Sequence, residues 1–276
     1  MKTRKAPSLS PNHKPSPQIR ALTIIEVLIL ISLIVILMGL LLPAHVYRGP
    51  SRGVMCKNNL RQLQLAWAMY AEDNHDKLAQ NIARNIGGGH YATTANQAGS
   101  QPGQPYASWV LGDASQPDAG FITNGLLFPY VNRLSFYKCP SDEKTNWNHL
   151  PSLRSYSMNA WMAGNPAWSS DYVNFMTGAS INKSMPSSLA LVFVEENPAT
   201  VNDGYWVQDP GSPTTWLDSP ARHHANGCNL SFADGHVEWR KWTDKNVLAG
   251  SSVRFASDAA SGDLAWVQAR CTVKAP

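Results

Sequence analysis

The longest uninterrupted stretch of apolar residues lies near the start of the chain, from Leu22 to Leu42. Sixteen of its 21 residues are Leu, Ile or Val, and its only charged side chain is Glu26. A helix of about 20 such residues crosses the ~30 Å hydrocarbon core of a bilayer, and the aliphatic side chains outweigh one carboxylate near an end. The pattern therefore predicts a transmembrane helix over 22–42. A buried core helix is the alternative, although such helices usually show a polar face.

A second helical pattern follows this run. Leu60, Leu63, Trp67 and Tyr70 stand at positions i, i+3, i+7 and i+10, which places them on one face of a helix. We expect this face to pack on a sheet and assign residues 43–80 to an extension of the N-terminal helix.

Strand patterns dominate the C-terminal part. Residues 189–196, LALVFVEE, are apolar and β-branched as in a buried strand, and 204–209, GYWVQD, predict another. Asp234-Gly235 separates two alternating runs, which is typical of a hairpin with a type I′ turn. The segments 252–257 and 264–273 predict further strands.

These elements predict an α+β fold, in which a long N-terminal transmembrane helix packs on a C-terminal antiparallel β-sheet. The globular domain spans 81–276, and the roughly 230 residues beyond the apolar run suffice for one domain or for a domain with an extension. Residues 84–120 are rich in Gly, Ala, Gln, Asn and Pro and predict a long loop within it.

Charge separates residues 1–21 from the rest of the chain. This segment is basic and contains no acid; its cations are Lys2, Arg4, Lys5, Lys14 and Arg20. The positive-inside rule keeps it in the cytoplasm and sends the domain to the other side. Without these five cations, 18 cations face 19 acids, a net charge of −1, so the overall charge of +4 does not indicate a nucleic-acid partner. The prolines and serines of residues 1–21 predict that this segment is a disordered leader, which we expect to be removed.

The start of the apolar run resembles the processing site of type IV prepilins and of the pseudopilins of type II secretion. That site reads Gly, then Phe-Thr-Leu-Ile-Glu, and here Ala21 and Leu22 replace the glycine and the phenylalanine. Thr23 and Glu26 match, and Pro43 stands where the family's helix is interrupted by proline.

The resemblance implies a pilin-like fold, cleavage between Ala21 and Leu22 by a prepilin peptidase, and methylation of the new N-terminus. It also implies that Glu26 faces the amino terminus of a neighbouring subunit in a filament, where pairing offsets the cost of a buried acid. An uncleaved signal anchor, with Glu26 among lipid headgroups, is the alternative.

A second resemblance lies in the predicted hairpin. His224 is followed by nine residues and then Asp234-Gly235, the H-X9-DG pattern of many prepilin-like proteins. The segments 56–63 and 137–142 are similar to other parts of this large-domain group, and the hairpin element spans 224–239.

The same element offers candidate metal ligands. His224, Asp234 and His236 can bind a divalent metal, with Glu195 or Glu196 as a further ligand from a strand end. The alternative, which we favour, is that Asp234 serves the turn and His224 hydrogen-bonds the hairpin backbone, with no cofactor.

All four cysteines follow the apolar run. None has CxxC spacing, so disulfides are favoured over a zinc site, and three connectivities exist. We favour Cys56 with Cys139 and Cys228 with Cys271; free buried thiols are the alternative. Either bond would contribute about 4 kcal/mol in the chain-entropy model.

Three functions remain. The sequence favours a pseudopilin of a type II secretion or type IV pilus-like filament, with prepilin peptidase, other pilin-like subunits and the bacterial inner membrane as partners. The protein is expected to cross this membrane once, with its N-terminus in the cytoplasm and its C-terminal domain in the periplasm. A membrane-anchored periplasmic module that binds carbohydrate or another exported ligand comes second, and a metal-dependent enzyme third. No catalytic motif is present, so we predict that the protein is not an enzyme.

Overall fold

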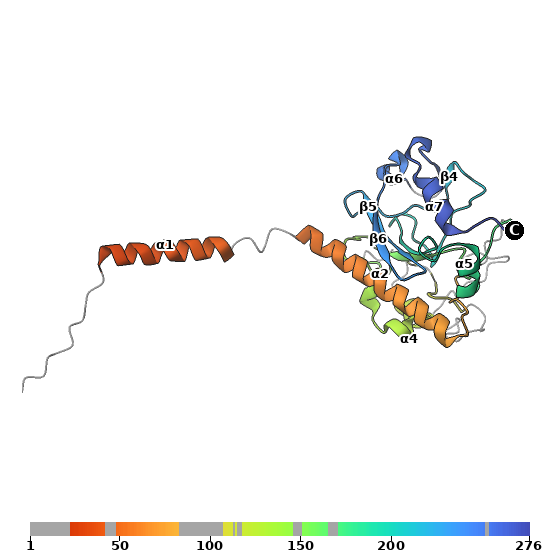
Figure 1. Cartoon of the computed structure of the whole chain (residues 1–276), viewed down its shortest axis with the longest axis horizontal. Coiled ribbons are helices and arrows are strands. Elements are labelled where there is room, and N and C mark those ends of the chain that lie inside the picture. The colour runs from red at the N-terminus through yellow and green to blue at the C-terminus, as the bar shows by residue number, and fades with distance from the viewer. Residues whose placement is uncertain are drawn as a thin grey trace, which may run out of the picture. The chain divides into compact units, whose positions relative to one another are not determined.

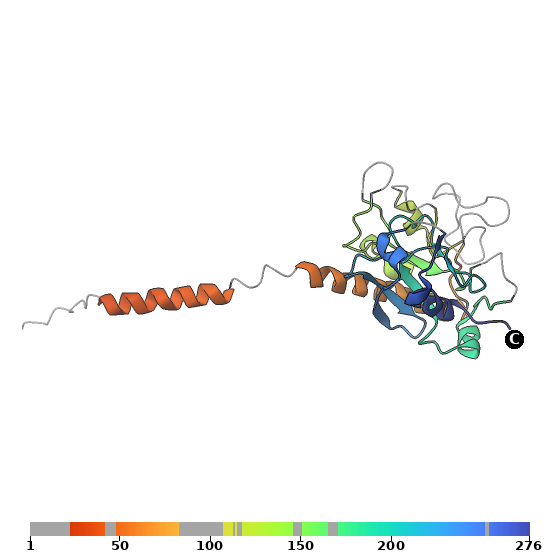
Figure 2. The same cartoon turned by 90° about the horizontal axis from the view of Figure 1, so that it is seen from above.

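The computed structural model describes residues 23–41, 48–82, 107–112, 114, 118–145, 151–164, 171–251 and 254–276. The chain divides into two compact units, Met1–Arg48 and Gly49–Pro276. The first contains helix α1 and the second contains an α+β domain (Figures 1 and 2). The predicted leader, the processing pair Ala21 and Leu22, and Pro43 lie outside the described residues.

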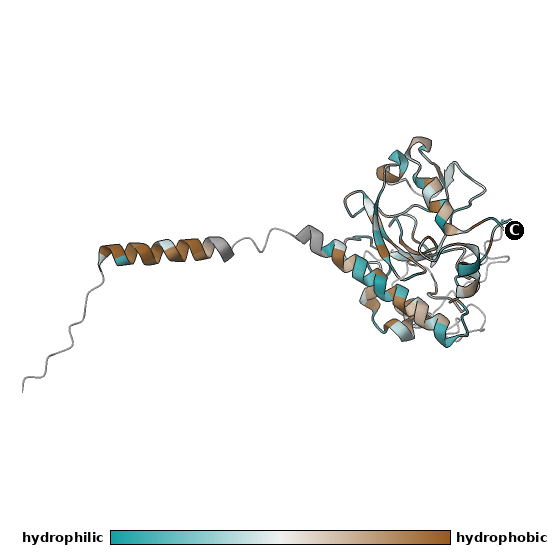
Figure 3. Ribbon diagram, viewed as in Figure 1, coloured by the Kyte–Doolittle hydropathy of each residue, from teal (hydrophilic) through white to brown (hydrophobic). Residues whose placement is uncertain are grey.

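Helix α1 (Ile24–Leu41) is apolar along nearly its whole length (Figure 3). Among the residues that the structure describes, no helix is both long and apolar enough to cross a membrane. The predicted transmembrane helix over 22–42 and the single-pass anchor in the inner membrane are therefore wrong. The described helix has 18 residues, which extend about 27 Å at 1.5 Å each.

Helix α2 (Arg48–Asp73) contains both apolar and polar residues along its length (Figure 3). Its apolar stripe is buried, as the spacing predicts. Leu60 and Leu63 are fully buried, and Trp67 and Tyr70 are 4% exposed. The helix ends before residue 80 because the chain turns sharply, with left-handed φ values at the two residues His75 and Asp76.

The main sheet has five strands in the order β3-β1-β2-β5-β6. Their bounds are β1 (Tyr156–Asn159), β2 (Leu191–Glu195), β3 (Tyr205–Trp206), β5 (Gly227–Phe232) and β6 (Val237–Lys241). The sheet is mixed, so the prediction of an antiparallel sheet is wrong. The chain crosses from β2 to the far side of β1, which makes β3 antiparallel to β2 and parallel to β1.

Apolar clusters cover both faces of this sheet. On one face, the α2 stripe packs with Tyr156, Met158 and Phe193, and the Ser231 hydroxyl donates a 2.8 Å hydrogen bond to Gln64 of α2. On the other face, Leu230 and Phe232 belong to a second cluster that includes residues of α7 (Asp263–Cys271). The domain thus has a layer of helix, a sheet, and a second layer beyond it.

Short elements complete the domain. They are α3 (Gly120–Thr123), α4 (Phe128–Val131), η2 (Leu134–Tyr137), α5 (Gly178–Ser184), α6 (Lys245–Ala249), η3 (Ala259–Ser261), and a two-stranded sheet of β4 (Thr215–Trp216) and β7 (Phe255–Ala256).

The strand predicted over 264–273 is mostly helix α7. Leu264, Val267, Gln268 and Cys271 are its buried residues after Asp263, and their spacing of i, i+3, i+4 and i+7 is helical. The apolar run in this segment was too short for its period to separate a strand from a helix.

The predicted hairpin is formed by β5 and β6, with Ser231 opposite Val237. Its turn differs from the predicted type I′. The Phe232 amide donates to the His236 carbonyl at 3.1 Å, the Gly235 amide donates to the Phe232 carbonyl at 2.9 Å, and Gly235 has φ 92° while Asp234 is not left-handed. This is a three-residue loop in which only the glycine needs a positive φ.

Candidate functional site

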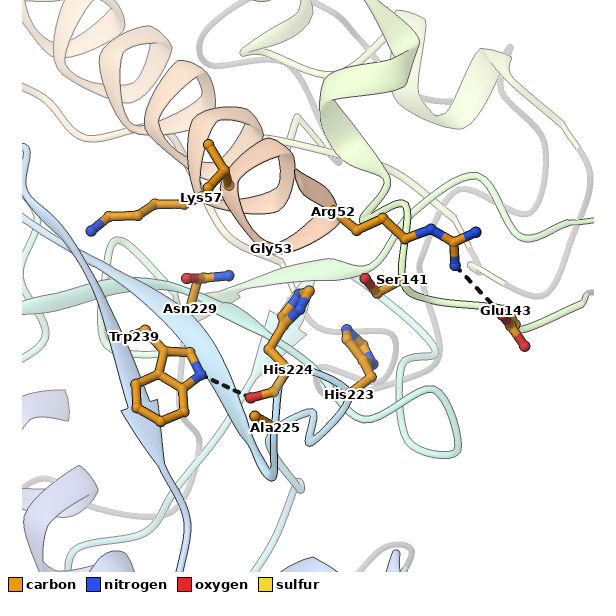
Figure 4. Close-up of a pocket in the computed structure, with 11 residues that line it drawn as sticks. Arg52, Gly53, Lys57, Ser141, Glu143, His223, His224, Ala225, Asn229 and Trp239 are labelled. Atoms are coloured by element: carbon orange, nitrogen blue, oxygen red, sulfur yellow. Dashed lines mark hydrogen bonds and ion pairs between the residues drawn. The ribbon is translucent and has the colours of Figure 1, made fainter. Parts of the chain in front are cut away.

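His224 lies three residues before β5, in a tight turn. Its backbone exchanges two hydrogen bonds with Gly227, of 3.2 and 3.1 Å, and the two residues between them, Ala225 and Asn226, have φ of 51° and 64°. The indole of Trp239 on β6 donates to the His224 carbonyl at 2.9 Å (Figure 4). These bonds fix the backbone, and the imidazole is 9% exposed.

The His224 ring meets two groups from distant parts of the chain. Its Nε2 lies 3.2 Å from Oε1 of Glu195, the last residue of β2, and 3.3 Å from Sγ of Cys139. Cys139 forms a disulfide with Cys56 of α2. The ligand-type atoms of Cys56, Cys139, Glu195 and His224 all lie within 4.8 Å of one another. Four side chains with metal-ligand chemistry therefore converge where α2, β2 and β5 meet.

Neighbouring groups hold this cluster in place. The second oxygen of Glu195 accepts hydrogen bonds from the backbone amide and the side chain of Asn229, at 2.6 and 3.2 Å. The Cys139 sulfur accepts the Ser141 amide at 3.4 Å, and the Cys139 amide donates to the Ser155 hydroxyl at 3.0 Å. Because Glu195 is fully buried, the two Asn229 donors and His224 provide the polar contacts that a buried carboxylate requires.

A cavity of about 730 Å³ opens beside His224 (Figure 4). Its lining comes from the start of α2, from the segment after Cys139 and from the hairpin, and comprises Arg52, Gly53, Val54, Lys57, Ser141, Glu143, His223, His224, Ala225, Asn229 and Trp239. Arg52 and Lys57 give the α2 side a positive charge, partly balanced by the 3.9 Å ion pair of Arg52 with Glu143. The cavity provides a path from solvent to the imidazole.

The predicted ligand set of His224, Asp234, His236 and Glu195 is only partly brought together. His224 and Glu195 are in contact, but Asp234 and His236 lie at the opposite end of β5, about 20 Å away for six extended residues. Asp234 accepts from the His236 amide at 3.1 Å and contacts its Nδ1 at 2.5 Å, and this pair is solvent-accessible. Asp234 thus serves the turn, and one metal ion cannot bind both ends of the strand.

Glu196, the alternative acid, does not join the cluster. Its carboxylate accepts a short hydrogen bond from the Ser157 hydroxyl, and burial raises its pKa. Adjacent residues of an extended chain point to opposite sides, which separates Glu196 from Glu195.

The second predicted disulfide is not formed. Cys228 and Cys271 are both free and fully buried. Burial raises the pKa of both thiols, and the charge of Glu195 adds to the effect at Cys228. Both therefore remain protonated and unreactive at neutral pH.

His223 stands beside the cluster without joining it. Its ring centre lies 4.9 Å from that of His224, and burial together with the neighbouring His224 lowers the pKa of His223 despite the opposing charge of Glu195. The lowered pKa favours the neutral form of His223.

Tryptophan serves mainly the core. Trp109, Trp161, Trp206, Trp216 and Trp242 are fully buried, whereas Trp239 at the cavity is 47% exposed. Among the described tryptophans, Trp239 has the most exposed side chain.

Sequence reasoning missed that the disulfide and the hairpin histidine belong to one cluster. The Cys56–Cys139 disulfide was predicted, but nothing in the spacing of the segments 56–63 and 137–142 relates them to residue 224. Pairing across the sheet is what brings Glu195 to the start of β5, through Val194 opposite Leu230. That register was not readable from the sequence.

Comparisons with known proteins found no family model, no curated protein and no solved structure that matches this chain.

Proposed function

We propose that the protein is a non-enzymatic structural subunit of a pilus-like filament, a pseudopilin, that assembles through α1. The observation that carries this proposal is the surface of α1. Its 13 large apolar side chains from Ile24 to Met38 are 43 to 83% exposed and surround the helix. A helix that is apolar on every side is stable in water only when other molecules cover it.

Glu26 supports identical or similar helices as the covering partner. Its carboxylate accepts hydrogen bonds from the amide and hydroxyl of Thr23 at 2.8 and 2.9 Å, which lower its pKa and keep it charged. A charged acid inside a bundle of helices requires a cation. In α1 itself no Lys, Arg or His is available. The processing that the resemblance implies would create one, the amino group of Leu22 on a neighbouring subunit, after cleavage by a prepilin peptidase.

The experiment expresses the full chain in a host with a prepilin peptidase and measures assembly by electron microscopy and by cross-linking of an Ile34→Cys variant. Glu26→Gln preserves the shape of the side chain and removes its charge, so we expect loss of filaments and cross-links. Glu72→Gln, a matched change at an exposed acid of α2, should assemble normally. Mass spectrometry should find N-methyl-Leu22 as the first residue. Monomers with an intact Met1, unaffected by Glu26→Gln, would contradict the proposal.

A second candidate, a ligand-binding module, is favoured by the cavity with the half-exposed Trp239. An aromatic ring beside polar side chains is typical of sites that stack on a sugar. Titration with soluble oligosaccharides, followed by tryptophan fluorescence in the wild type and in Trp239→Ala, tests it. A saturable signal that the variant loses would favour this function.

A further inference from the structure

We propose that reduction of the Cys56–Cys139 disulfide converts the cluster at His224 into a binding site for one Zn²⁺ ion. The ligands are the two thiolates, Nε2 of His224 and a carboxylate oxygen of Glu195. This site is independent of filament assembly, since it involves no residue of α1.

The geometry matches a zinc site. Tetrahedral zinc with bonds of about 2.0 to 2.3 Å places its ligand atoms about 3.3 to 3.8 Å apart. Here Nε2 of His224 lies 3.3 Å from the Cys139 sulfur and 3.2 Å from the Glu195 oxygen, and all four atoms fall within 4.8 Å. Once the bond between the sulfurs is broken, small rotations of the side chains complete the tetrahedron.

The chemistry of the donors also matches. Two thiolates, an imidazole and a carboxylate form a ligand set that zinc accepts, and a closed four-residue set is typical of structural sites. Asn229 already orients Glu195, and the Ser141 amide stabilises charge on the Cys139 sulfur. Such surrounding hydrogen bonds position ligands and strengthen metal binding.

Charge balance favours a divalent cation once the thiols lose their protons. Cys56, Cys139 and Glu195 are fully buried, so two thiolates beside a carboxylate are stable there only with a cation. With neutral His224, Zn²⁺ leaves a net charge of −1. Arg52 and Lys57 line the adjacent cavity, where their charges favour that residual anion.

The redox step balances with a dithiol as reductant. The dithiol transfers two electrons and two protons to the disulfide, forming two protein thiols and its own disulfide. Zinc then binds the two sulfurs as thiolates and releases two protons. The oxidised protein has no thiolates at this position, so disulfide and zinc exclude each other.

The test uses the full chain and Co²⁺ as a spectroscopic substitute for zinc. After anaerobic reduction with a dithiol and its removal, we expect one Co²⁺ per chain, with thiolate-to-cobalt charge transfer and tetrahedral d–d bands, displaced by Zn²⁺. Without reduction these bands should be absent. Equal cobalt binding before and after reduction, or no binding after it, would overturn the proposal.

Variants identify the ligands. His224→Ala and Glu195→Gln should each weaken zinc binding by about tenfold or more. His236→Ala, at the far end of the hairpin, should leave it unchanged. A background of Cys228→Ala with Cys271→Ala removes the other thiols and should retain full binding. Unchanged affinity in His224→Ala, or loss of binding in this background, would contradict the ligand assignment.

Alkylation mapping of the wild type tests the site even if the variants do not fold. In the reduced wild type, zinc should protect Cys56 and Cys139 from alkylation, as read by mass spectrometry. If reduction unfolds the domain, zinc should restore the fold under reducing conditions. Failure to protect these two cysteines, or to refold the reduced chain, would count against the site.

Discussion

Helices α1 and α2 differ in the exposure of their apolar residues. The apolar side chains of α1 are exposed on every side, whereas α2 buries one stripe, including Leu60 and Leu63, against its own sheet. A disulfide from Cys56 also connects α2 to the rest of the domain. The buried stripe and the disulfide can stabilise the domain by itself, whereas α1 needs other molecules to cover its apolar side chains.

The largest effect is expected from removing the disulfide that links α2 to the rest of the domain. Cys56→Ala with Cys139→Ala removes a bond that closes a loop of 83 residues, so we expect the free energy of unfolding of the domain to fall by about 4 kcal/mol. Urea denaturation with a metal chelator present measures it. Cys228→Ala, at an unpaired thiol, is the control and should cost much less. Equal losses in the two proteins would show that the disulfide adds no stability.

A smaller effect is expected from the same leucine-to-alanine substitution in each of the two helices. Leu63→Ala should destabilise the domain by about 3 kcal/mol, because it opens a cavity under α2. Leu30→Ala, the same substitution on the 51% exposed surface of α1, should change the stability of the domain by less than about 0.5 kcal/mol. Both are read from denaturation followed by tryptophan fluorescence. A comparable loss in Leu30→Ala would mean that the domain relies on α1.

Periodicity over long segments predicted much of this fold. The α2 stripe, the strand within residues 189–196 and the β5–β6 hairpin follow from spacing that tertiary packing did not override. Short segments were less informative: 264–273 reads as a strand by composition but forms α7, whose buried side is visible only once Leu264 and Val267 are placed. The parallel pairing of β1 with β3 depends on a crossover that no local pattern encodes.

The candidate site was predictable only in its components. His224 and Glu195 were named as ligands, but the H-X9-DG spacing suggested Asp234 and His236 as their partners, and a six-residue strand separates these from His224. The sulfurs of Cys56 and Cys139 take their place. Side chains of distant segments meet through sheet register and a disulfide, and neither determines spacing along the sequence.

The smallest expected effect concerns two acids, one in each region. In the domain, Asp218 is partly buried, and burial together with Asp203 raises its pKa to about 7, while the Val207 amide and Arg254 oppose the shift. Its neighbour Glu196 also has a raised pKa. In α1, hydrogen bonds from Thr23 lower the pKa of the exposed Glu26.

The sign of the pH effect follows from Asp218. An unfolded aspartate ionises near pH 4, whereas the folded one keeps its proton up to about pH 7. The stability that this proton contributes is complete below about pH 4 and is lost as the pH rises to about 7. Asp218→Asn cannot ionise but can still accept from Val207, so its free energy of unfolding should exceed that of the wild type at pH 8 by on the order of 2 kcal/mol. Denaturation curves between pH 4 and 8 measure this difference. Parallel profiles for Asp218→Asn and wild type would contradict the assignment of this pH effect to Asp218. Glu26→Gln is the control and should reproduce the wild-type profile, because only an acid held within the packed domain binds its proton more tightly when folded than when unfolded.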